Sequence, residues 1–123
     1  MAAANITIPT TTETNGPTTN SLPIPYGNGK VRVTGIAQIG TGTGVTAVQV
    51  RIRRNINGEN VVVGFVNNVA AAASSQIAVP VEFTDQLNDG RSVQYTLSVQ
   101  QVGATGNGTI SAGTTIDAMV MSG

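Results

Sequence analysis

Three arginines lie close together in VTAVQVRIRRN, residues 45–55, and they carry the most conspicuous chemistry in the chain. Arg51, Arg53 and Arg54 are half of its six basic residues. A guanidinium group binds a phosphate or a carboxylate through parallel N–H donors. The cluster therefore predicts either a nucleic-acid patch or a set of ion pairs.

The spacing of the arginines favours ion pairs or solvent. Arg51 and Arg53 alternate with apolar residues, so they share the polar face of a strand whose other face is core. A nucleic-acid surface needs more cations there, and the chain is neutral overall, with six basic and six acidic residues. We expect no nucleic-acid partner. We interpret the two arginines as a solvated face, or as part of a subunit interface with carboxylates such as Glu82 or Asp85.

The composition removes most catalytic chemistry. The chain has no cysteine and no histidine, which excludes thiol nucleophiles, disulfides and the usual general base near neutral pH. Six acidic residues leave room for a paired-carboxylate site, although such a site depends on two well-placed acids. We predict a protein that is not an enzyme, with no catalytic residues, no cofactor and no metal site.

Two loops resemble ligand sites and are better explained as turns. Asp85, Asn88 and Asp89 offer oxygen ligands for calcium, but their spacing matches no calcium loop, and turns use the same residue types. The stretch GTGTG, residues 40–44, resembles a phosphate cradle, but a dinucleotide site needs a helix after the glycines and here a strand follows. We interpret it as a flexible hairpin tip.

From Lys30 to the end, apolar residues recur at every second position, with glycine, asparagine or aspartate between the runs. Pro80 marks an edge strand or a bulge, because it has no N–H to donate. About eight short strands without a helical period predict an all-β chain, a mostly antiparallel sandwich or jelly roll. The clearest of these strands are expected within residues 31–34, 46–54, 61–66, 77–83, 93–99, 109–111 and 115–121.

Residues 1–29 predict an extended arm ahead of a sandwich domain of residues 30–123. The segment is rich in Thr, Asn, Pro and Ala, and it cannot offset its ordering entropy unless it lies against something else. Ile6 and Ile8 show a short alternation, and the run Leu22-Pro23-Ile24-Pro25-Tyr26 suits an extended strap that docks into a groove. We predict attachment through these residues; a simple spacer is the alternative.

The last predicted strand has apolar residues on both faces. Asp117, Met119 and Met121 share one face, opposite a small apolar stripe, and methionine adapts well to contacts. In a single sandwich one of these faces is exposed to water, so we predict a subunit interface here, along a threefold axis. A core strand with irregular facing is the alternative.

Several stretches together resemble a known group of proteins: FTD at 83–85, Gly90, VQYTLSV at 93–99 and GTISAGTTIDAMV at 108–120. They look like the C-terminal half of small jelly rolls in tailed-bacteriophage virion proteins, which are similar to the tumour-necrosis-factor and complement-globular-head superfold. The preceding VQVRIRRNING resembles that group's outward-polar strand and hairpin. The likeness implies an antiparallel jelly roll of about eight strands and a homotrimer with its C-terminal strands near the axis.

What the resemblance implies for function is a capsid decoration or head-fibre protein. Its N-terminal arm would bind the major capsid protein or another virion protein on the outer surface of the particle. The N-terminus lacks the regions of a signal peptide, and no segment approaches the ~20 apolar residues of a membrane span. We therefore expect synthesis in the host cytoplasm without a signal peptide, and no membrane partner.

An alternative role is a neck or tail-fibre module that binds a receptor or glycan. The loops at residues 40–44, 85–90 and 103–108 would form its binding surface. The chain has only two tyrosines, two phenylalanines and no tryptophan, which argues against stacking on sugar rings. An enzyme is the least favoured reading, and a cleft with two carboxylates at catalytic separation would revive it.

Overall fold

The computed structural model describes residues 5–23, 26–56, 58–89 and 92–122, and this part of the chain contains strands and no helix. The prediction of an all-β chain is confirmed. The strands are β1 (Ile6–Ile8), β2 (Thr14–Thr18), β3 (Leu22–Pro23), β4 (Tyr26–Gly40), β5 (Ala47–Ile56), β6 (Glu59–Ala70), β7 (Gln76–Asp89), β8 (Ser92–Val102), β9 (Gly108–Ile110) and β10 (Thr115–Ser122).

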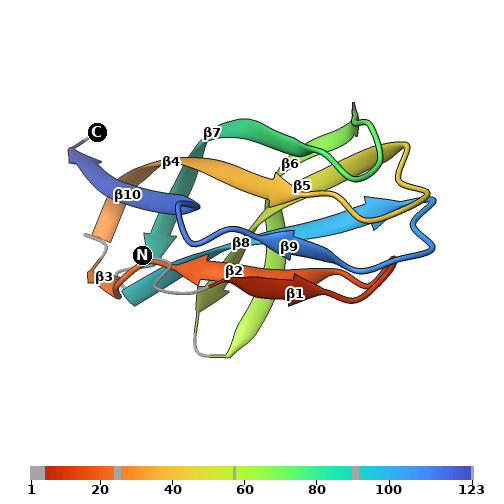
Figure 1. Cartoon of the computed structure of the whole chain (residues 1–123). Coiled ribbons are helices and arrows are strands. Elements are labelled where there is room, and N and C mark those ends of the chain that lie inside the picture. The colour runs from red at the N-terminus through yellow and green to blue at the C-terminus, as the bar shows by residue number, and fades with distance from the viewer. Residues whose placement is uncertain (1–4, 24–25, 57, 90–91, 123) are drawn as a thin grey trace.

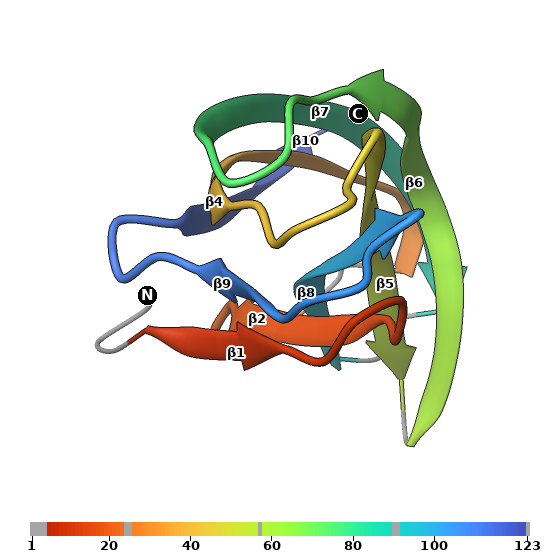
Figure 2. The ribbon, with the colours of Figure 1, turned by 45° about the vertical axis from the view of Figure 1, so that its right-hand side comes forward.

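Two antiparallel sheets pack face to face as a sandwich, as predicted (Figures 1 and 2). In the first, which we call sheet A, β7 pairs with one edge of β4, β10 and β9 follow each other along its other edge, and β1 pairs with β9. In the second, sheet B, β8 pairs with β2 and β3 on one edge and with β5 on the other, and β6 pairs with β5. Pro80 therefore lies on an edge strand, β7, as its missing N–H predicts.

The strand pairs are nested around the β5–β6 hairpin. Moving outward along the chain, β4 pairs with β7, then β2 and β3 pair with β8, and finally β1 pairs with β9. Successive pairs alternate between sheet B and sheet A. The chain thus resembles one long antiparallel hairpin wrapped around itself, which brings β1 next to β9.

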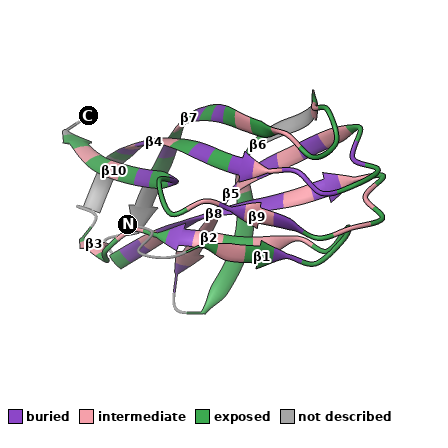
Figure 3. Cartoon of the chain, viewed as in Figure 1, coloured by how far each residue is buried: buried purple, intermediate pink, exposed green. Residues whose placement is uncertain are grey.

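The core between the sheets is built from alternate residues of the central strands (Figure 3). On β8, the residues Val93, Tyr95, Leu97 and Val99 are all buried, with at most 1% of each exposed. β4 and β5 contribute valines and isoleucines to the same layer. Most residues of this core belong to the predicted period-two runs. Burying each such aliphatic side chain stabilises the fold by roughly 1.5–3 kcal/mol.

In its described part, residues 5–23, the N-terminal segment belongs to the sandwich. Ile8 is fully buried, and Ile6 and Leu22 pack against the core. Pairing with β9 and β8 supplies the backbone partners that this composition needs to become ordered. The boundary predicted between residues 29 and 30 falls inside β4, which runs from Tyr26 to Gly40.

Two predicted loops differ from the structure. Residues 85–89 continue β7 as a strand, because the long β4 pairs with it as far as Tyr26. Residues 40–44 do join two strands, but this connection is held firmly: Gly42 N–H donates to Gln101 Oε1 at 2.7 Å. A Cβ on Gly42 would lie 2.6 Å from the backbone oxygen of Asn107, so the close approach requires glycine.

Candidate functional site

Arg51 and Arg53 lie on the outer face of sheet B, and their partner is Glu13 from the N-terminal segment. Arg53 donates to both carboxylate oxygens of Glu13, at 2.6 and 2.7 Å, and Arg51 Nη1 lies 3.7 Å from Glu13 Oε1. Ser98 Oγ donates to the same carboxylate at 2.5 Å. Two parallel hydrogen bonds are the preferred geometry between arginine and a carboxylate. We call Glu13, Arg51, Arg53 and Ser98 the Glu13 cluster.

The Glu13 cluster holds its carboxylate in the charged form. The pKa of Glu13 is lowered from 4.5 to about 2, mainly by the hydrogen bonds from Arg53, while partial burial acts in the opposite direction. The hydrogen bond from Ser98 and the charge of Arg51 contribute to the same lowering, and the Glu13 carboxylate in turn raises the pKa of Arg53. Ser98 is fully buried on an outer face. A segment of the same chain therefore covers this part of sheet B.

Further hydrogen bonds fix the same segment along β8. Gln100 Nε2 donates to the carbonyl oxygen of Thr11 at 2.9 Å, and Gln101 Nε2 donates to that of Thr10 at 2.8 Å. Thr10 N–H donates to Asn107 Oδ1 at 3.2 Å. Side chains of sheet B and its loops thus fasten residues 10–13 in place.

Arg54 belongs to a second cluster, with Asp85 and Tyr95. Strand β5 shifts its register against β6 between Ile52 and Arg53, just before Arg54. Arg54 Nη1 donates to both carboxylate oxygens of Asp85, at 3.0 and 3.1 Å. Tyr95 Oη donates to the same carboxylate at 2.8 Å. Burial, and then the Asp85 carboxylate, raises the pKa of Tyr95, so its phenol remains a donor. Asp85 and Tyr95 are buried and Arg54 is partly buried, and the hydrogen bonds among the three have a structural role.

The residues predicted for an interface on the C-terminal strand lie on the outer face of sheet A. Asp117, Met119 and Met121 are exposed side chains of β10, and their neighbours on β4 are Thr34, Arg32 and Lys30. Met119 is 63% exposed and Met121 is 40% exposed. In the single chain, this apolar surface is open to solvent.

The five residues predicted for a subunit interface do not form one surface. Arg51 and Arg53 lie on the outer face of sheet B, whereas Asp117, Met119 and Met121 lie on the outer face of sheet A, on the other side of the sandwich. The two arginines also have a carboxylate of their own chain as partner. The C-terminal set alone remains a single uncovered surface.

The residues predicted for attachment are also spread out. Ile6, Ile8 and Leu22 face the core of their own chain, and Pro23 is exposed on β3. Ile24 and Pro25 lie outside the described residues. Tyr26 begins β4, and only its backbone is described.

The three loops predicted to bind a receptor do not share one end of the molecule. Residues 40–44 and 103–108 meet each other: Thr105 N–H donates to the carbonyl oxygen of Thr43 at 2.8 Å. Asp89, in contrast, pairs with Tyr26 at the opposite end of β4 from the Gly40–Gln76 pair. A binding surface made from all three loops is therefore not assembled in one chain.

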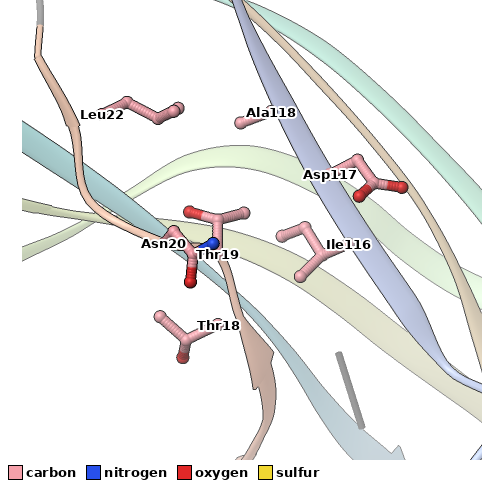
Figure 4. Close-up of a pocket in the computed structure, with 7 residues that line it drawn as sticks. All are labelled: Thr18, Thr19, Asn20, Leu22, Ile116, Asp117 and Ala118. Atoms are coloured by element: carbon pink, nitrogen blue, oxygen red, sulfur yellow. The ribbon is translucent and has the colours of Figure 1, made fainter.

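A groove with a volume of about 370 Å³ lies beside β10 (Figure 4). Residues 18–20 and Leu22 line it on the side of sheet B, and residues 116–118 line it on the side of sheet A. Thr19 is held to β8, because its N–H donates to the carbonyl oxygen of Tyr95 at 2.8 Å. A smaller depression of about 240 Å³ also includes Asp117 and Ala118, next to Met119.

Three acidic side chains are held in ion pairs, and no group of metal-ligating residues occurs among the described residues. Within residues 5–23, 26–56, 58–89 and 92–122, no three Asp or Glu side chains come together to hold a metal ion. Glu13, Glu82 and Asp85 are each paired with an arginine. No helix in this part of the chain is long and apolar enough to cross a membrane. The ion pairs of Glu13, Glu82 and Asp85 hold segments of the chain to one another.

Glu13 was not identified by sequence reasoning, although a signal for it exists. It is the only charged residue in the first 29 positions, and three arginines on one strand require acidic partners if they are covered. Of the acids suggested for this role, Glu82 pairs with Arg32 and Asp85 pairs with Arg54, both within the chain.

No protein-family model and no curated protein matches this chain.

Proposed function

We propose that this protein is a non-enzymatic structural component of a tailed-phage particle, a capsid decoration or head-fibre protein on the outer surface of the virion. In this proposal the sandwich is a jelly roll, copies of the chain form a homotrimer, and the assembly binds the major capsid protein or another virion protein. The single observation that carries the proposal is the exposed apolar surface on β10. The clustered arginines of β5, in contrast, form ion pairs within the chain.

The nested pairing supports the jelly-roll assignment. A jelly roll is an eight-stranded double sheet, and it is common in viral capsid proteins. When β2 with β3, and β9 with β10, are each counted as one interrupted strand, the ten strands reduce to eight. Their pairs then alternate regularly between the sheets.

The outer face of sheet A supports the proposed contact between copies. Ile36 is 43% exposed beside Thr115, at the start of β10, and Met119 and Met121 continue the apolar surface along that strand. Exposed apolar patches on small proteins mark interaction sites. Paired charges such as Arg32 and Glu82 border it, as in the polar rim of many interfaces.

Attachment to the particle is assigned to the outward side of the N-terminal segment. Ile8 faces inward and stabilises the fold, whereas Thr7 and Asn15 are exposed on β1 and β2. Removing the whole segment would damage the core, so a deletion does not test attachment cleanly. Substitution of the outward side chains is the better test.

The decisive experiment is cosedimentation with phage particles that encode this chain but have been purified without it. Saturable binding of the wild-type chain, with a native mass of three chains, is expected. Thr7→Lys changes the outer face of sheet A and Asn15→Lys that of sheet B, so the two are made singly, and the one on the attachment side should bind less. A Glu59→Lys variant, changed on the exposed start of β6, should bind normally. Absence of binding by a folded wild-type chain would show that the proposed function is wrong.

A further inference from the structure

Strand β10 has one unpaired edge. It pairs with β4 from the Thr115–Ile36 pair to the Ser122–Gly29 pair, and no other described strand pairs with it. The strand that would continue along this side, β1, ends its pairing at the Ile6–Ile110 pair on β9. The backbone groups on this side of β10 therefore lack partners in the described part of the chain.

The other edges of the two sheets carry features that hinder pairing with another strand. β7 contains Pro80 and the exposed Glu82, and β1 is three residues long and followed by Pro9. β2 contains Pro17 and an irregular register. β6 is bulged at two places against β5. Prolines, charges, bulges and short length are the usual protections of edge strands.

Of these protections, β10 has only one charge, Asp117. Its sequence TIDAMVMS contains no proline and a single charge, and its register against β4 is regular over all eight residues. The groove of about 370 Å³ leaves space beside the strand (Figure 4). A regular, apolar edge strand is a template for another strand.

We infer that β10 pairs with β10 of a second copy of this chain, antiparallel, about a twofold axis at Met119. Directly opposed residues in an antiparallel pair share a face, so odd-numbered residues oppose odd-numbered ones. With Met119 opposite its counterpart, Asp117 lies opposite Met121 of the second copy. Sheet A of one copy and sheet A of the other then form one continuous sheet. Met119 and Met121 of both copies lie together on its outer face.

Charge complementarity supports this register. Lys30 is the neighbour of Met121 on β4, so it lies about 10 Å, or two strand spacings, from Asp117 of the second copy. The combined length of the two side chains is enough to reach across the methionine between them. Neither Lys30 nor Asp117 has an ionic partner among the described residues of its own chain. In the twofold contact, Lys30 of each copy pairs with Asp117 of the other, so two ion pairs form.

This contact does not depend on a phage particle, and it differs from the proposed threefold assembly. A twofold contact alone gives a dimer, and a twofold contact between trimers gives a hexamer. Native mass spectrometry and sedimentation velocity of the whole chain distinguish these cases. A dimer or hexamer supports the inference. A monomer or an isolated trimer at all concentrations overturns it, although the trimer would still agree with the proposed function.

The twofold axis at Met119 is tested with charge variants of this 63% exposed side chain. Met119→Lys and Met119→Glu each place two like charges at the axis, so each should weaken self-association at least tenfold. Mixing the two variants should restore it as an even-numbered, equimolar assembly. If the mixture associates no better than either variant alone, the axis is not at Met119 and the inference fails.

The Lys30–Asp117 pairing is tested by exchanging charges. Lys30→Asp and Asp117→Lys should each raise the dissociation constant about tenfold, and the double variant should return it to near the wild-type value. Glu59→Lys, which changes the net charge as much as Asp117→Lys, is the matched control and should have no effect. Independent, additive effects of the two substitutions would overturn the assigned register.

Discussion

Glu13 shows how one carboxylate can position a whole segment. It is bonded to Arg53 and Ser98, and Arg51 lies nearby, so an otherwise uncharged segment is fixed to an outer sheet face. The arginines that resembled a nucleic-acid patch are therefore internal partners. Their role is to make the N-terminal segment part of the fold.

Replacing Glu13 by glutamine should lower the stability of the chain in a pH-dependent way. The pKa of Glu13 is about 2 in the folded chain, against an ordinary value of 4.5. Its stabilisation is therefore complete above about pH 4.5 and is lost as the pH falls toward 2. About 1–2 kcal/mol is expected at pH 7, because the side chain is 23% exposed and water screens the pair.

Chemical denaturation from pH 2 to 7 measures this effect. The difference between wild type and Glu13→Gln should shrink steadily below pH 4.5 and nearly vanish near pH 2. Glu59→Gln, on the exposed start of β6, is the control and should follow the wild type closely. A Glu13→Gln difference that stays constant over this range would contradict the assigned ion pair.

The Arg54–Asp85–Tyr95 cluster makes a second prediction. Tyr95→Phe removes one donor from the buried carboxylate but leaves the arginine, so we expect a loss of about 1–2 kcal/mol. Asp85→Ala leaves both partners without an acceptor and should cost about 3–5 kcal/mol. Thermal unfolding at pH 7 compares the two. A larger loss for Tyr95→Phe than for Asp85→Ala would show that the carboxylate is not the centre of the cluster.

Among the elements, β1 is small but contributes to the core. Ile8→Ala removes a fully buried side chain and should destabilise the fold by about 2–4 kcal/mol. Thr7→Ala, the adjacent exposed position on the same strand, should change stability by less than about 0.5 kcal/mol. Urea unfolding of both variants measures the difference. If the Ile8→Ala and Thr7→Ala variants were equally stable, the segment would be an arm outside the core, as the sequence alone predicted.

The individual strands could be predicted from sequence because their signal is local. Val93, Tyr95, Leu97 and Val99 alternate with polar residues, and that period is visible in any window of the chain. Which strand pairs with which is not visible in this way. Ile6 pairs with Ile110, about a hundred positions away, and short alternation at Ile6 gives no indication of that partner.

The candidate sites show the same limit. The polar face of β5 was predicted correctly, with Arg51 and Arg53 on it, but their partner Glu13 comes from a segment that was predicted to be an arm outside the sandwich domain. The C-terminal methionines were predicted to lie at a contact between subunits, and that stays a prediction; in the single chain they are exposed. Period-two patterns report the face of a residue, but they do not report what lies on that face.

At the scale of the whole molecule, the nested pairing means that most contacts join distant parts of the chain. The β5–β6 hairpin closes a turn of a few residues, whereas the β1–β9 pair closes nearly the whole chain. Loop closure must precede non-local contacts, so folds of this kind are expected to form in milliseconds to seconds. The order of the pairs along the nest also gives an order of formation.

We predict that folding proceeds outward from the β5–β6 hairpin and ends with β1. In pulse-labelled hydrogen exchange, amides of β5 and β6 should gain protection first and those of β1 last, because β1 needs its partner β9 already in place. In mutant kinetics, Ile8→Ala should then speed unfolding and leave the folding rate almost unchanged, whereas Val50→Ala, in the core of β5, should slow folding. Matching folding rates for both variants, or simultaneous protection of β1 and β5, would instead indicate that the chain closes its ends at the start of folding.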